Sequence, residues 1–164
     1  MIPWFLKPTK VFLLIHIISY QSKYQPDFKR LNLEWLNKFN LTEEADLKVL
    51  NDPEGTILET GGFIFLAEYD GEIVGTAALI PEHAGEYELA KMAVRPDMQG
   101  RGISKLLLQA CLDAAINSGA KKLILFSNSQ LQTALKLYQK FGFQFVELKD
   151  SPFETADIKM ELAL

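Results

Sequence analysis

The sequence predicts an α/β (α+β) protein in which a mixed, mostly antiparallel twisted sheet of about seven strands is flanked by about four helices. Hydrophobic side chains over residues 63–94 form three short runs separated by turn residues, which is typical of consecutive antiparallel strands. From Gly102 the hydrophobic spacing changes to three and four residues, which indicates a helix. The predicted order is strand, two helices, three strands, helix, strand, helix and two strands.

Length and composition predict a single domain over residues 1–164, because domains usually hold about 100–200 residues. Apolar residues make up 48% and charged residues 23% of the chain, which excludes a disordered or collagen-like protein. The single cysteine, Cys111, excludes an internal disulfide and a cysteine-based zinc site. Two histidines offer little for a histidine-rich metal site. We therefore expect no metal and a reducing, cytoplasmic setting.

The net charge of −4 gives no general electrostatic reason to bind nucleic acid or an anionic membrane, so we expect neither partner. The apolar stretch 11–18 superficially resembles a signal peptide. It is far shorter than the roughly 20 residues that span a bilayer, and no small-residue cleavage site follows it. We interpret Val11–Ile18 as a buried strand.

The next segments carry turn and capping signals. A helix is expected from Pro26-Asp27, since proline is tolerated in the first turn. Thr42 is the predicted N-cap of a second, short helix that ends at residues 51–55. The Asp70-Gly71 pair predicts a hairpin turn between strands 63–67 and 73–80.

The remaining elements follow from hydrophobic spacing. After a turn over residues 81–86, the third strand of the meander is expected over 87–94. The helix that opens at Gly102 runs to Ser118 and carries Cys111 on its apolar face. The elements predicted after it are a strand over 123–126, a helix over 131–141 and strands over 143–148 and 157–162.

Residues 94–104 join the end of a strand to the start of a helix through a glycine-containing loop. The first turn of a helix has unpaired N–H groups and a partial positive charge, so this loop can hold an anion such as a phosphate. A dinucleotide fingerprint needs a third glycine where Lys105 stands, and a Walker loop needs four residues where only Arg101 separates Gly100 from Gly102. Two interpretations of residues 94–104 therefore remain, a plain strand-to-helix turn and a phosphate-binding loop of another kind.

Two motifs resemble those of the GNAT (general N-acetyltransferase) superfamily. Residues 88–96, followed by Gln99-x-x-Gly102-x-Ser104, are similar to the family's acetyl-coenzyme A motif, Gln/Arg-x-x-Gly-x-Gly/Ala. Ser104 departs from that pattern, but serine is small and its hydroxyl can donate to a phosphate oxygen.

A second resemblance lies in Ser127-Asn128, Ala134 and residues 137–143. The resemblance covers roughly residues 60–164, and the N-terminal third is similar only in its strand-helix-helix order. The resemblance implies the GNAT fold and an N-acetyltransferase that moves the acetyl group of acetyl-CoA directly to a primary amine in a ternary complex.

The resemblance also implies two catalytic residues, Tyr138 as the acid that protonates the leaving thiolate and Glu88 as the base, acting through water. Each has an alternative. Tyr138 shares a helix face with Leu135 and also suits a core position. Glu88 also fits a solvated carboxylate at a strand start, and its neighbour Glu86 offers the same chemistry.

Strand alternation places Glu88 on the same face as Ala90, Met92 and Val94, with Lys91 solvated on the other face. The resemblance implies that the strand end pairs with the pantetheine arm, that the loop holds the pyrophosphate and that Asn128 reaches the pantetheine. The implied cofactor-binding residues are Met92, Ala93, Val94, Gln99, Gly100, Arg101, Gly102, Ile103, Ser104 and Asn128.

The expected acceptor is a small-molecule amine or a peptide amine that enters opposite the coenzyme, past the first helices and residues 81–86. Its candidate lining residues are Phe28, Asn32, Trp35, Glu86 and Glu88. The alternative is a catalytically weak acyl-CoA-binding sensor or interaction module with the same fold. A homodimer formed through an exposed sheet edge or through the C-terminal strand is compatible with either.

Overall fold

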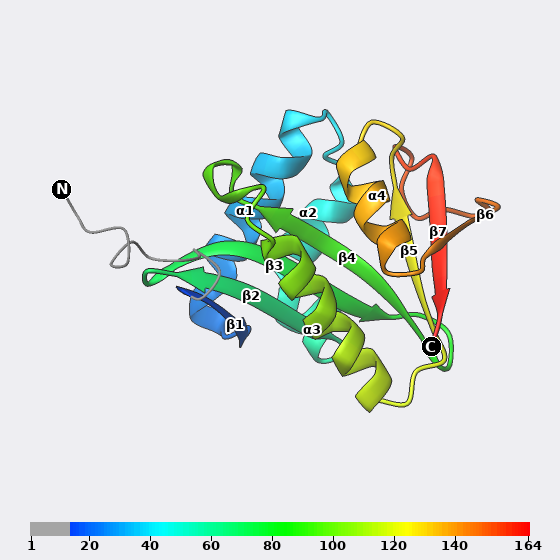
Figure 1. Ribbon diagram of the computed structural model, residues 1–164, viewed down its shortest axis with the longest axis horizontal. Coiled ribbons are helices and arrows are strands. Elements are labelled where there is room, and N and C mark those ends of the chain that lie inside the picture. Colours follow the sequence, from blue (N-terminus) through cyan, green and yellow to red (C-terminus); the bar gives the residue numbers. More distant parts are fainter. Residues whose placement is uncertain (1–13) are drawn as a thin grey trace, which may run out of the picture.

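A computed structural model describes residues 14–164 and shows a seven-stranded sheet in the order β1-β2-β3-β4-β5-β7-β6 (Figure 1). All neighbouring strands are antiparallel except β4 and β5. The strands are β1 Ile15–Ser19, β2 Phe63–Tyr69, β3 Glu72–Pro81, β4 Glu86–Val94, β5 Lys122–Ser127, β6 Gln144–Val146 and β7 Ile158–Ala163. The longer helices are α1 Gln25–Lys38, α2 Glu44–Asn51, α3 Ile103–Asn117 and α4 Gln132–Lys140. The predicted fold class and element order are confirmed.

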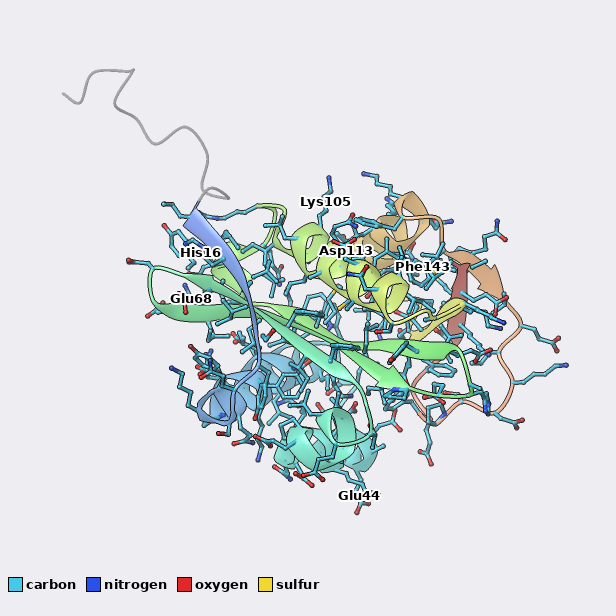
Figure 2. All side chains as sticks on the ribbon, turned by 90° about the horizontal axis from the view of Figure 1, so that it is seen from below. His16, Glu44, Glu68, Lys105, Asp113 and Phe143 are labelled. Carbon is cyan, nitrogen blue, oxygen red and sulfur yellow. The ribbon has the colours of Figure 1, made fainter. Side chains whose placement is uncertain are left out.

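Helices cover both faces of the sheet. Figure 2 shows the sheet between α3, which carries Lys105 and Asp113, and α2, which carries Glu44. The core on the α3 and α4 side includes Leu107, Leu108 and the predicted core residue Cys111. The core on the α1 and α2 side is built around Phe28, Leu31 and Leu50.

The N-terminal elements differ from the predictions in detail. Residues 11–13 of the predicted first strand lie outside the described residues, and β1 begins at Ile15. The N-cap of α2 is Glu43, not Thr42. The Glu43 carboxylate accepts the Asp46 backbone N–H, and the Asp46 carboxylate accepts the Glu43 N–H, so the two acids form a reciprocal capping box. After α2 the chain continues helically over η4 Glu54–Leu58, where only a turn was predicted.

The hairpin turn between β2 and β3 is confirmed. Asp70 and Gly71 have φ of 50° and 77°, so both central residues are left-handed. This is the backbone shape that a two-residue turn needs to match the twist of the flanking strands.

A β-bulge interrupts β4 and changes which side chains share a face. Thr76 pairs with Ala93 but Ala78 pairs with Ala90, so two residues of β4 oppose one of β3. Lys91 lies in this bulge with φ of 53°.

The bulge separates Glu88 from the end of β4. Glu88 pairs with Ile80, which packs against the α1 and α2 core, whereas Met92 and Val94 pack on the α3 and α4 side. The prediction that Glu88 shares a face with Met92 and Val94 is therefore wrong, because strict alternation does not pass through a bulge.

Strands β4 and β5 diverge after a short parallel ladder, as Figure 1 shows. Residues Glu86–Glu88 pair with Lys122–Ile124, and no pairing follows between the rest of the two strands. The end of β4 therefore has one edge without a strand partner inside the sheet.

Candidate active site

Two cavities meet where β4 and β5 diverge. The larger, of about 600 Å³, lies between the end of β4, the start of α3 and α4. The smaller, of about 120 Å³, lies between α1, α2, β4 and β5. Four residues line both cavities, namely Trp35, Met92, Leu131 and Tyr138. Groups held in the two cavities can therefore meet beside Tyr138.

The amino end of α3 opens into the larger cavity. The first N–H groups of a helix, here those of Ile103, Ser104 and Lys105, have no carbonyl partner within it, and no side chain caps this end. Gly100 and Gly102 have φ of 75° and 83°, and a Cβ on either would project into open space. These residues, all on the cavity wall, form a cradle of N–H groups for an anion.

The charge on the wall of the larger cavity fits a polyanion. Lys38, Lys105, Lys136 and Lys140 line it, and no acidic side chain of the described residues does. The chain as a whole has a net charge of −4, so this positive lining is local. An N–H cradle with surrounding lysines fits the pyrophosphate of a coenzyme.

Most of the predicted cofactor residues line this cavity, namely Met92, Ala93, Val94, Gln99, Gly100, Gly102, Ile103 and Ser104. The Gln99 side chain donates to the Val94 carbonyl at 3.1 Å and so holds the loop closed. Arg101 is exposed and does not line the cavity. Asn128 lines the smaller cavity, where its amide donates to the Thr155 carbonyl at 2.7 Å.

The lysines of the larger cavity were not predicted from the sequence. Lys136 and Lys140 lie four residues apart on α4, a spacing that places them on one helix face. This spacing was the only sequence pattern that could have indicated a cluster of lysines on α4. The same spacing is common on solvated helix faces, so it did not identify a site.

Tyr138 lies on α4 between the two cavities. Its side chain is 9% exposed, and its hydroxyl lies 3.9 Å from the Met92 sulfur. Burial raises the pKa of Tyr138 to about 12, so the hydroxyl carries its proton at neutral pH. The ring also packs against Phe143, at 5.9 Å between centroids. Tyr138 is thus part of the core and lines both cavities.

Glu88 lines the smaller cavity and is 6% exposed. Burial, followed by the nearby Glu82 carboxylate, raises the pKa of Glu88 to about 8, while the Lys91 ammonium opposes that rise. A base is most effective when its pKa is close to the working pH. Glu86 instead pairs with Lys122 at 3.1 Å and lies outside both cavities.

Of the other residues predicted to line the acceptor site, some line the smaller cavity and some do not. Asn32 and Trp35 line the smaller cavity. Phe28, which lies one helical turn before Asn32, does not line this cavity because its side chain is fully buried in the core. Residues 81–86 do not line the smaller cavity either.

Lys91 is buried, contrary to the prediction that it is solvated. The bulge directs its side chain into the α1 and α2 side, where Nζ lies 2.6 Å from Asp46 Oδ1. The two side chains are 6% and 5% exposed. The ammonium also lies 5.2 Å from the centroid of the Phe153 ring.

Residues 153–157, here called the strap, close the smaller cavity from the side of β7. Phe153, Thr155 and Ala156 line it. The Glu43 carboxylate accepts the backbone N–H groups of Glu154 and Thr155, at 2.8 and 3.0 Å, and the Thr155 hydroxyl. This contact joins residues more than 100 positions apart, so no local pattern in the sequence indicated it.

The sequence profile described as the Acetyltransferase (GNAT) family matches residues 22–143. The chain belongs to this family. The match includes the whole of β4, the glycine loop, α3 and α4. The resemblance seen in the two motifs is thereby confirmed.

Relatives and solved structures agree with this assignment. An uncharacterized N-acetyltransferase of Mycobacterium bovis is 33% identical over 105 residues, 64% of this chain and 63% of that protein. YjgM of Escherichia coli, also an uncharacterized N-acetyltransferase, is 30% identical over 92 residues, 54% of this chain and 55% of that protein. The chain thus spans between half and two thirds of the length of these relatives.

Two crystal structures share the fold. A GNAT-family acetyltransferase of Staphylococcus aureus superposes with a TM-score of 0.84 at 24% identity, covering 91% of this chain and 98% of that one. The PaiA N-acetyltransferase of Thermoplasma acidophilum, in complex with coenzyme A, has a TM-score of 0.71 at 16% identity, with 92% and 99% covered.

Two features are absent from the described part of the chain. Within residues 14–164 no helix is long and apolar enough to cross a membrane. Over the same range no three metal-binding side chains of His, Cys, Asp or Glu come together.

Proposed function

We propose that this chain is an N-acetyltransferase that holds acetyl-CoA in the larger cavity and a primary amine in the smaller one. The observation that carries the proposal is the meeting of the two cavities at Tyr138, with Glu88 on the amine side. One cavity suits a polyanion, and the other contains a buried carboxylate with a raised pKa. Membership of the GNAT family and the shared fold support the same assignment.

The chain's own groups suit the coenzyme. The N–H groups at the start of α3 and the cavity lysines would hold the phosphates, and the free edge of β4 over Met92–Val94 would hold the pantetheine arm as an added strand. Bound acetyl-CoA would supply an acetyl thioester.

The amine acceptor needs a base. A lysine-like amine is neutral in only about one molecule in 2,500 at pH 7. Glu88 would accept the proton that the nitrogen loses as it bonds to the acetyl carbon, directly or through one water. Tyr138 would donate its proton to the sulfur, which keeps the electron pair as the carbon–sulfur bond breaks. Glu88 then releases its proton to solvent and solvent reprotonates Tyr138, so protons balance.

The proposal is tested by following thiol release from acetyl-CoA with a thiol dye across a panel of amines, with mass spectrometry of the products. We expect release that depends on an amine and an acetylated amine as product. Thiol release without acetylated amine contradicts the proposal. Coenzyme binding without release for any amine favours the sensor or interaction module instead.

The variant Tyr138→Phe removes only the hydroxyl. We expect kcat to fall by about 10²-fold or more, the usual contribution of an acid, while coenzyme affinity changes little. The matched control is Tyr87→Phe, because the Tyr87 hydroxyl is outside both cavities and contacts the Gly61 carbonyl at 3.4 Å. Equal kcat values for the two variants would show that Tyr138 serves packing alone.

A further inference from the structure

The smaller cavity contains a buried ammonium group whose hydrogen-bonding capacity is mostly unused. An ammonium has three N–H donors. Among residues 14–164, Lys91 Nζ has one hydrogen-bond acceptor, Asp46 Oδ1 at 2.6 Å. The ring of Phe153 covers another side of the group. Since Lys91 lines the cavity and its side chain is 6% exposed, an oxygen atom brought in by the acceptor can satisfy a remaining donor.

Glu88 and Lys91 face this cavity from the same strand. The bulge at Lys91 brings both side chains to the α1 and α2 side, although they are three residues apart. One offers a proton acceptor and the other a proton donor. A molecule with an amine N–H and an oxygen acceptor a few bonds apart matches this pair.

The charges and the volume of the smaller cavity limit which acceptors can bind there. Asp46 already neutralises Lys91, so the oxygen can belong to a neutral carbonyl or to a carboxylate. A volume of about 120 Å³ suits a small unit, and Trp35, Phe126 and Phe153 supply apolar walls.

Resting on the proposed function, we propose that the acceptor is an α-amino carbonyl compound, a free α-amino acid or the first residue of a peptide, whose carbonyl or carboxylate oxygen is bound by Lys91. Its nitrogen then lies toward Glu88 and Tyr138. Such an amine also lessens the protonation problem, because a peptide α-amino group has a pKa of about 7.7–8.0 against about 10.4 for lysine.

The test compares L-alanine, L-alaninamide and ethylamine as acceptors, because ethylamine is alanine without its carboxylate. The enzymes are the wild type, Lys91→Met/Asp46→Asn and the control Lys149→Met. The double substitution removes both charges together, so no unpaired buried ion remains. The asparagine side chain introduced by Asp46→Asn keeps an oxygen for the Glu43 N–H, which the Asp46 carboxylate accepts at 2.9 Å in the wild type. Lys149 is an exposed lysine outside both cavities.

In the wild type and in Lys149→Met we expect kcat/KM, calculated on the concentration of neutral amine, to be about tenfold or more higher for alanine or alaninamide than for ethylamine, as one hydrogen bond to a charged group allows. Using the neutral amine removes the effect of the acceptors' different pKa values. In the double variant this ratio should fall by about tenfold. A preference for alanine alone identifies a carboxylate ligand, and equal use of alaninamide identifies a carbonyl. The ratio is insensitive to a changed pKa of Glu88, which affects every amine alike.

Two results overturn the inference while leaving the proposed function intact. One is a wild-type ratio near one together with clear acetylation of ethylamine. The other is the same ratio in the wild type and the double variant. By contrast, no acetylation of any amine by a protein that binds acetyl-CoA contradicts the proposed function itself.

Discussion

Glu88 is buried in a place that opposes its ionisation, and this has consequences for both catalysis and stability. Its pKa of about 8 results from burial and from Glu82, with Lys91 acting in the opposite direction. At pH 7 the carboxyl is mostly protonated, but it is a stronger base than an ordinary glutamate. Asp46 on α2 completes the set of charges that act on it.

The variant Glu88→Gln should lower kcat by about 10²-fold or more and remove the dependence of the rate on this group. In the wild type, kcat/KM should rise with pH through about 8, since the carboxylate is the active form. Steady-state rates from pH 6 to about 9.5 measure both effects. Glu86→Gln is the control, because Glu86 lies outside both cavities. An unchanged rate and pH profile in Glu88→Gln would assign the base elsewhere.

Although Glu88→Gln should lower activity, it should stabilise the fold at high pH. The folded pKa of Glu88 is raised, so the unfolded chain loses this proton at lower pH than the folded one. Folding is therefore progressively disfavoured as pH rises from about 4.3 to about 8. Relative to the wild type, Glu88→Gln should be more stable at pH 8 than at pH 5, as thermal unfolding at the two values would show.

At the level of elements, the site depends on how β4 ends. The ladder to β5 stops at Glu88, the bulge follows at Lys91, and the glycine loop begins after Val94. The bulge places the Glu88 side chain on one face of the strand and the side chains of Met92 and Val94 on the other. The loop then directs the chain into α3, whose first N–H groups face the larger cavity.

These features were predictable from the sequence to different degrees. The Asp70-Gly71 turn and the Gly100–Gly102 loop were recognised because a residue type and a local backbone shape determine each other there. The bulge was missed because Lys91 carries no residue signal for a left-handed backbone. Its burial was missed because its partner, Asp46, is 45 residues away. The smaller cavity is therefore the part of the candidate site that was least predictable from the sequence.

Glu43 joins α2 to the strap and gives a prediction at the level of elements. Glu43→Ala should lower the free energy of unfolding by about 1–3 kcal/mol, since it removes a charged acceptor of several hydrogen bonds. The amides of Glu154 and Thr155 should exchange hydrogen faster, and KM for the amine should rise. Glu44→Ala is the control, because Glu44 is exposed on the same helix (Figure 2).

Unchanged protection of the two strap amides in Glu43→Ala would contradict this role.

The contribution of Glu43 to stability should also depend on pH, because of the same contacts. Although burial opposes it, the hydrogen bonds from Thr155 and Glu154 lower the pKa of Glu43. The contribution of Glu43 is thus complete above the ordinary glutamate pKa and is lost as pH falls through the lower folded value.

At the scale of the whole molecule, charge is distributed unevenly. The net charge of −4 would repel a polyanion, yet the described wall of the larger cavity carries four lysines and no acid. Coenzyme affinity should therefore depend on local attraction, which salt screens over about 10 Å at 0.1 M ionic strength.

We expect the Kd for acetyl-CoA to rise about threefold or more between about 50 and 500 mM NaCl. Lys136→Gln should weaken binding and reduce this salt dependence, whereas Lys149→Gln, an exposed lysine outside both cavities, should do neither. Titration calorimetry at the two salt concentrations measures both quantities. A salt-independent Kd in the wild type would show that the lysines do not hold the phosphates.

The proposed binding of the coenzyme at the start of α3 is tested most directly by titration calorimetry with Gly102→Val and Gly119→Val. Both glycines have left-handed φ, 83° and 76°, at opposite ends of α3, so valine introduces similar strain in each. Of these two glycines, only Gly102 lines the larger cavity. The expected result is wild-type affinity for acetyl-CoA in Gly119→Val and a loss of about tenfold or more in Gly102→Val. Equal affinities in the two variants, or no binding by the wild type, would contradict the account.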